Sequence, residues 1–213
     1  MTNAQSAIHL ETIEYKDEKT TCVGTLVHDN AHPGRLPGVL LCPTFWGAEA
    51  LARRKATQIA RLGYTVLVMD PYGDGKVAET REEANDLMMP LVKDRALALE
   101  LARDGADLKA VVSFHGILDN GGAKPPENIK PAVLILHGSD DPIVPPPQVA
   151  AFIDEMRAAK ADWQMVHYGG AVHAFTNPDA ADAAFGTVYQ EAADKRSWRL
   201  MAAHLQEAFT DRG

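Results

Sequence analysis

An acidic turn and a distant histidine are the residues of this sequence whose types and spacing could do chemistry. The turn, residues 138–142 (GSDDP), follows the apolar run 132–136 after one residue, His137, and His173 lies thirty-two positions after Asp141. An aspartate that holds a histidine, so that the histidine can take a proton from a nucleophile, is the acid–base half of a hydrolase triad, and acid before histidine is one of the chain orders in which triads occur. The spacing predicts Asp141 as the acid and His173 as the base. Asp140 competes for the role of acid, and we prefer Asp141 because it directly precedes the proline.

The elements that must position these residues follow from short apolar runs bounded by turn residues. Such runs are typical of strands buried in a parallel sheet, whose carboxyl ends carry the functional site. Strands that alternate with helices predict an α/β fold, a doubly wound and mainly parallel sheet with helices on both faces. The predicted buried strands are residues 38–42, 65–69, 109–114, 132–136 and 163–168. One predicted helix opens at residues 43–47 and runs to about Leu62. Two further helices are predicted at 80–103 and 148–160, and a last one around 198–209.

Two further local patterns are specific. Residues 8–28 alternate apolar and polar twice, which predicts a hairpin with its turn at 16–19. Thr80 with Glu83 forms a capping box for the helix that follows, and Pro90 is expected to kink or interrupt that helix.

Composition bounds the class of protein. A chain of 213 residues suits one domain, residues 1–213, and a formal charge of −8 with a pI near 5.4 argues against nucleic acid or anionic membrane as a partner. The amino terminus lacks the apolar core of a signal peptide, no apolar run approaches membrane-spanning length, and Cys22 and Cys42 do not suggest a disulfide framework. We expect a cytoplasmic protein without a bound cofactor, and no His/Cys/carboxylate cluster has the spacing of a metal site.

Several longer motifs carry a family resemblance. The pieces are PTFWG, RLGYTVLVMDPYGDGK, ELARDGADLKAVVSFHG, LILHGSDDPIVP and GGAVHAFTNP, which occur in this order from about Gly38 onward. Together they resemble the dienelactone hydrolase family, a branch of the α/β-hydrolase fold. The resemblance implies hydrolysis of small esters or lactones by a cysteine or serine nucleophile, with Asp141 as acid, His173 as base and the backbone N–H of Phe45 as an oxyanion donor. It also implies a pocket lined by Thr44, Trp46 and His115.

The sequence departs from that family in two places. Thr44 stands where the family usually has a glutamate that helps to regulate the nucleophile. The larger departure is that no Gly-x-Cys-x-Gly or Gly-x-Ser-x-Gly elbow occurs anywhere in the chain. The family pattern reaches residue 95 and resumes at residue 96. What the family has between these positions, and this chain lacks, is one strand and one helix, about thirty residues.

Cys42 and Ser113 are the possible substitute nucleophiles. An elbow requires small residues two positions before and two after the nucleophile, so that the backbone can approach the substrate. Neither residue has small neighbours at both of these positions. They are Leu40 and Thr44 around Cys42, and Val111 and His115 around Ser113. A buried inert thiol and a serine at a strand end are the alternative interpretations.

Two functions therefore stay open at the level of sequence. One is a hydrolase of small esters or lactones that uses Asp141 and His173; the other is a catalytically inactive relative that binds an ester, lactone or carboxylate. For the fold we expect one helical connection, residues 80–103, to lead into the strand 109–114, which would take the vacated central place in the sheet and bring Ser113 and His115 near the position of the lost elbow.

Overall fold

The computed structural model describes residues 7–94, 98–121 and 128–210. The chain divides into two compact units, Met1–Ala96 and Leu97–Gly213, and each is described by itself. Within the described ranges, no helix combines the length and the apolar character that crossing a membrane requires.

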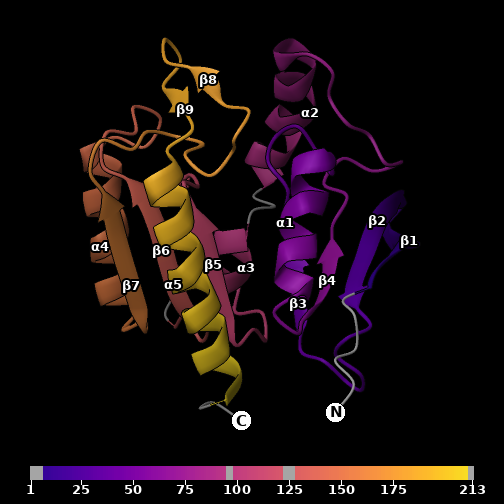
Figure 1. Cartoon of the computed structure of the whole chain (residues 1–213). Helices are drawn as coiled ribbons and strands as arrows, with labels where there is room; N and C mark the ends of the chain where they lie inside the picture. Colours follow the sequence, from indigo (N-terminus) through magenta and orange to yellow (C-terminus); the bar gives the residue numbers. More distant parts are fainter. Residues whose placement is uncertain (1–6, 95–97, 122–127, 211–213) are drawn as a thin grey trace. The chain divides into compact units, whose positions relative to one another are not determined.

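The first unit is built on a sheet of order β1-β2-β4-β3 (Figure 1). β1 and β2 form the predicted antiparallel hairpin, ten residues paired on each side, while β3 runs parallel to β4. The strands are β1 (Ile8–Asp17), β2 (Thr20–Asp29), β3 (Gly38–Leu41) and β4 (Thr65–Val68).

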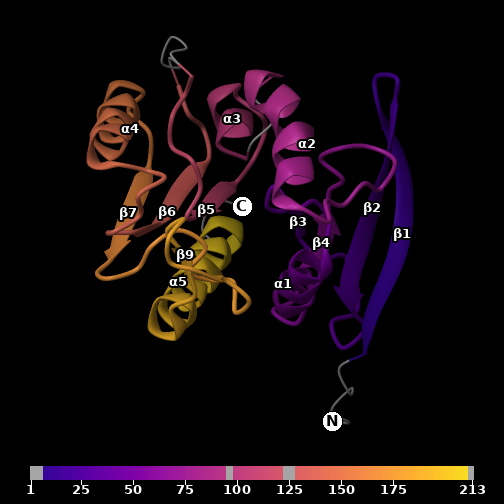
Figure 2. The same ribbon diagram turned by 90° about the horizontal axis from the view of Figure 1, so that it is seen from above.

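Two helices cover this sheet, α1 (Ala50–Ala60) and α2 (Arg81–Asp94), and Figure 2 shows them on opposite sides of β3 and β4. The Thr80 hydroxyl accepts a hydrogen bond from the Glu83 amide at 3.2 Å, as the capping box predicts. The helix is not interrupted at Pro90, because α2 continues through it to Asp94. The other expected effect, a kink at Pro90, stays a prediction.

A buried carboxylate organises the turn that follows β4. Asp70 is 3% exposed, and its two oxygens accept hydrogen bonds from the backbone N–H groups of Val23, Tyr72, Gly73 and Gly75 at 2.8–3.1 Å. This turn is therefore fixed to β2 by one side chain.

The second unit contains a parallel sheet of order β5-β6-β7, with α3 and α4 on one face and α5 on the other (Figure 2). All seven residues of β6 are buried, as expected for a central parallel strand covered on both faces. A short antiparallel pair, β8 with β9, lies in the segment before α5. The elements are α3 (Ala98–Arg103), β5 (Ala110–Phe114), β6 (Ala132–Gly138), α4 (Pro146–Ala158), β7 (Trp163–Tyr168), β8 (Ala181–Asp182), β9 (Thr187–Val188) and α5 (Glu191–Thr210).

The α/β class is confirmed, but the predicted place of β5 is wrong. Among the described strands β5 pairs only with β6, and β3 pairs only with β4, so each is the edge of its own sheet. Leu40 of β3, predicted to be buried, is 46% exposed. Apolar content alone does not distinguish an edge strand from a central one, since the difference lies in which strand pairs with it.

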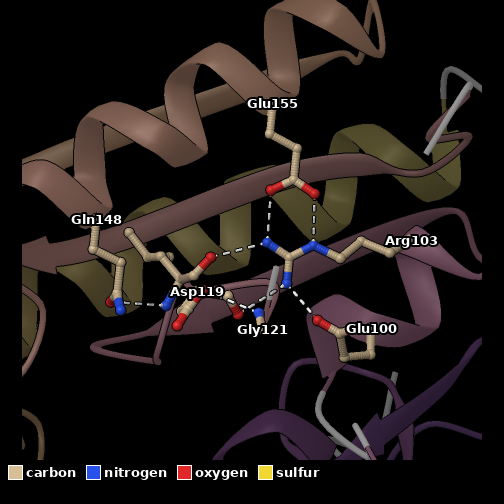
Figure 3. A network of polar contacts seen from close by, with 7 residues as sticks. Glu100, Arg103, Asp119, Gly121, Gln148 and Glu155 are labelled. Atoms are coloured by element: carbon tan, nitrogen blue, oxygen red, sulfur yellow. Dashed lines mark hydrogen bonds and ion pairs between the residues drawn. The ribbon is translucent and has the colours of Figure 1, made fainter. Parts of the chain in front are cut away.

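A buried ion-pair network fixes α3 to the rest of the second unit (Figure 3). The Arg103 guanidinium donates two hydrogen bonds to the Glu155 carboxylate of α4, at 2.7 and 2.8 Å, and another to Glu100 one turn earlier. It also donates to the Leu118 carbonyl at 2.9 Å. Both charges of the Arg103–Glu155 pair are almost fully buried, with side-chain exposures of 7% and 5%. Such a pair holds its helices in one arrangement, because a shift would leave a charge without its partner.

Candidate active site

The turn after β6 approaches the backbone of a second loop very closely. A Cβ atom on Gly138 would lie 2.6 Å from the Ala171 carbonyl oxygen and 2.8 Å from that of Val172. The Asp140 amide donates to the same Ala171 oxygen at 3.0 Å. Only glycine leaves room for this approach, which brings the loop carrying His173 against the end of β6.

The two residues predicted as acid and base are hydrogen-bonded to each other. Nδ1 of His173 lies 2.9 Å from Oδ2 of Asp141. The other oxygen, Oδ1, accepts from the amides of Ile143 and Val144 at 2.8 and 3.3 Å, so the turn orients the carboxylate. Asp140, the competing acid, is exposed. The structure therefore brings Asp141 to the histidine.

The environment of Asp141 keeps its carboxylate ionised. Burial alone would raise the pKa of Asp141, but the hydrogen bond and charge of His173 and the two backbone amides outweigh it and hold that pKa below its usual value. With Asp141 accepting a hydrogen bond from Nδ1–H, the free lone pair of His173 is on Nε2. Nε2 has no hydrogen-bonding partner among the residues that the structure describes, and the side chain is 22% exposed. This is the geometry of a histidine able to accept a proton.

His115 lies beside this pair. It directly follows β5, and its ring centroid is 5.1 Å from that of His173 in an edge-on arrangement. Its Nε2 lies 2.9 Å from the hydroxyl oxygen of Thr176, and its backbone adopts a left-handed φ of +42°. Non-glycine residues in this region are uncommon and gather at functional sites, so the surroundings must hold His115 in place.

Thr176 was not found by sequence reasoning. It is 7% exposed and lies three residues after His173, in the VHAFTNP segment that carries the family resemblance. The signal was thus within a motif already identified, but the contact with His115 spans sixty-one residues and depends on the fold.

His137, at the end of β6, has a structural environment. It is 3% exposed, and its ring packs edge-on against His167 at 5.2 Å. Burial, followed by the nearby His167, lowers the pKa of His137, so this side chain is neutral near pH 7.

The structure does not give either substitute nucleophile an activated environment. Ser113 lies on β5 with its hydroxyl against Gly116, where an added Cβ would be 2.4 Å away, and within the described part of the chain it forms no hydrogen bond to His173. Burial raises the pKa of the Cys42 thiol to about 11, which disfavours the reactive thiolate.

The remaining predicted site residues belong to the turn after β3 in the first unit. The Tyr72 hydroxyl donates to the Phe45 carbonyl at 2.6 Å, and the rings of Phe45 and Trp46 pack at 4.9 Å. Thr44 closes the turn by accepting from the Gly47 amide at 2.9 Å. In the described ranges no acceptor pairs with the Phe45 N–H, the group predicted as oxyanion donor. The roles of Phe45, Trp46 and Thr44 stay predictions.

Comparison with known proteins identifies the family. The sequence model of the dienelactone hydrolase family matches residues 23–99 and 95–209, together most of the chain. The chain belongs to the dienelactone hydrolase family. The two matched segments meet at 95–99, where the sequence predicts the missing strand, elbow and helix.

Similarity to individual proteins supports this family assignment. An uncharacterized protein of Caenorhabditis elegans, K02A2.1, is 38% identical over 115 residues, 53% of this chain and 73% of the relative. The solved structure of m3DLH is 32% identical, with a TM-score of 0.88 over 95% of this chain and 99% of the other. The dienelactone hydrolase-like promiscuous phosphotriesterase P91, from metagenomic libraries, is 31% identical, with a TM-score of 0.87 over 95% and 99% of the two chains. These findings support a hydrolase function with a small-molecule substrate and an α/β-hydrolase-like fold.

Proposed function

We propose that this protein hydrolyses small carboxylic esters or lactones, with His173 as the base and Asp141 as the residue that orients it. The observation that carries the proposal is the 2.9 Å hydrogen bond between Nδ1 of His173 and the buried Asp141 carboxylate. Membership in the dienelactone hydrolase family adds to it. An orienting acid and a partly exposed base are two of the groups that acyl transfer requires.

The attacking group in this proposal is water. Ser113 forms no hydrogen bond to His173 among the described residues, and the raised pKa of Cys42 argues against that thiol. Nε2 of His173 takes a proton from water as the oxygen adds to the carbonyl carbon. The tetrahedral oxyanion then collapses, the bond to the leaving oxygen breaks, and the protonated His173 returns the proton to the departing alkoxide.

A second candidate function is a catalytically inactive protein that binds an ester, lactone or carboxylate. The absence of the nucleophile elbow from the sequence favours it. Loss of a triad nucleophile typically leaves only a small residual rate from the rest of the site, so an intact acid and base do not guarantee turnover.

The experiment that separates the two functions is hydrolysis of 4-nitrophenyl acetate by wild-type protein, His173→Ala and His32→Ala. His32 is a matched control, because its ring bonds the Arg61 carbonyl in the first unit. A hydrolase shows turnover above buffer that falls about 100-fold or more in His173→Ala and is kept in His32→Ala. If all three folded proteins match buffer, binding without turnover is the function to pursue. A 4-nitrophenyl phosphotriester is included because the relative P91 is described as a promiscuous phosphotriesterase.

A further inference from the structure

Two histidines face each other across the hairpin of the first unit. His9 of β1 and His28 of β2 are direct partners in the antiparallel register, and their ring centroids lie 5.0 Å apart with the planes tilted by 44°. Directly opposed residues of an antiparallel pair have their side chains on the same face of the sheet. The two imidazoles are therefore held side by side by the backbone.

Both imidazoles are available for a ligand. Within the described residues neither His9 nor His28 forms a hydrogen bond or an ion pair, although their rings contact each other. His9 is exposed and His28 is partly exposed. Two other surface histidines bond backbone carbonyls: His32 bonds that of Arg61, and His204 bonds that of Ala132. The exposed His167 packs edge-on at 5.2 Å against His137, which is only 3% exposed and so is less accessible to an ion.

We propose that His9 and His28 bind a divalent transition-metal ion of the Ni²⁺, Cu²⁺ and Zn²⁺ group. Imidazole nitrogens are preferred ligands of these ions. Bonds of about 2.0–2.1 Å to two imidazoles at a tetrahedral angle place the ring centroids about 5 Å apart. The observed separation of 5.0 Å matches this spacing, so small side-chain rotations bring two nitrogens onto one ion.

The site has two protein ligands and leaves its other coordination positions to water or to an added ligand. Among the residues that the structure describes, no group of three or more His, Cys, Asp or Glu side chains could hold a metal ion. Glu11 lies two residues after His9 and so on the same face of β1. Its carboxylate and the formal net charge of −8 favour a cation there. The site belongs to the hairpin and is independent of the proposed hydrolase function.

The test is calorimetric titration of the tag-free, full-length protein with Ni²⁺ at pH 7.5, beside ¹H–¹⁵N NMR spectra in which the paramagnetic ion broadens signals of nearby residues. We expect one ion per chain with a Kd of about 1 mM or tighter. Broadening should centre on residues 8–10 and 27–29.

Substitutions assign the ligands. Even outer-shell changes cost about 10–100-fold in metal affinity, so His9→Gln and His28→Asn should each weaken Ni²⁺ binding at least tenfold. His32→Ala and His167→Ala are the controls, and both should keep the wild-type affinity. Circular dichroism verifies the hairpin in each variant. Unchanged affinity in the folded His9 and His28 variants, broadening centred on His167, or no binding to the wild-type protein would each overturn the proposal.

Discussion

The buried Arg103 network provides a sharp test of how the second unit is held together. Arg103→Met keeps most of the apolar stem but removes the guanidinium, leaving the Glu155 carboxylate, 5% exposed, without its bidentate partner. The Leu118 carbonyl also loses its donor. Breaking a buried ion pair by removing one partner typically costs about 3–5 kcal/mol, because the remaining charge stays desolvated. We expect a loss of that size in the free energy of unfolding at pH 7.

The matched control lies on α4, the helix that carries Glu155. Arg157 pairs with Asp154 at 3.4 Å, but their side chains are 70% and 78% exposed. Exposed pairs contribute about 0–1 kcal/mol, so Arg157→Met should change stability little. Guanidinium denaturation followed by circular dichroism, with comparison of m values, measures both variants.

A double variant tests the same network. Arg103→Met combined with Glu155→Leu should recover part of the lost stability, because the buried charge of Glu155 is then absent. A loss below about 1 kcal/mol for Arg103→Met, equal to that of Arg157→Met, would refute the account of the network.

Other predictions concern turns and pH. Gly138→Ala should cost about 1–3 kcal/mol, because its Cβ would lie 2.6 Å from a backbone oxygen, whereas Gly169→Ala, with no atom within 4 Å of its Cβ, should be nearly neutral in the same denaturation assay. Asp70→Ala leaves four backbone N–H groups without their acceptor and should lower the free energy of unfolding by about 3 kcal/mol or more. Asp86→Ala, on the exposed side of α2, should change it by no more than about 0.5 kcal/mol. An equal effect of the two variants would contradict the role of Asp70. Because burial lowers the pKa of His137, the unfolded state binds more protons below about pH 6.5, so the urea midpoint should fall as the pH drops from 7 to 5 and His137→Asn should flatten that slope.

The sequence predicted most of the elements and the pairing of Asp141 with His173, because both leave local signals. The apolar run of β6 and the helical spacing of α4 are visible in neighbouring residues. The acid and the histidine each lie in a short motif, GSDDP and VHAF. The strand Trp163–Tyr168 leaves the same kind of local signal, and the observed strand has the predicted bounds.

The contacts that sequence could not predict join distant positions. Glu155 meets Arg103 across fifty-two residues, and no local pattern indicates which cation a buried glutamate will find. The edge strands β3 and β5 are as apolar as a central strand, so only the pairing distinguishes them. Likewise, His9 opposes His28 because the turn at residues 18–19 sets the hairpin register, and a shift by one residue would place them on opposite faces.

The most direct test of the central claim compares two adjacent aspartates. Asp141→Asn keeps the size of the side chain that meets His173 at 2.9 Å but removes the charge that orients it, whereas Asp140→Asn changes an exposed neighbour. In an activated-ester assay the account predicts that kcat/KM falls about 10²–10⁴-fold for Asp141→Asn and stays within about twofold of wild type for Asp140→Asn. Equal rates for the two variants, or a larger loss for Asp140→Asn, would contradict it.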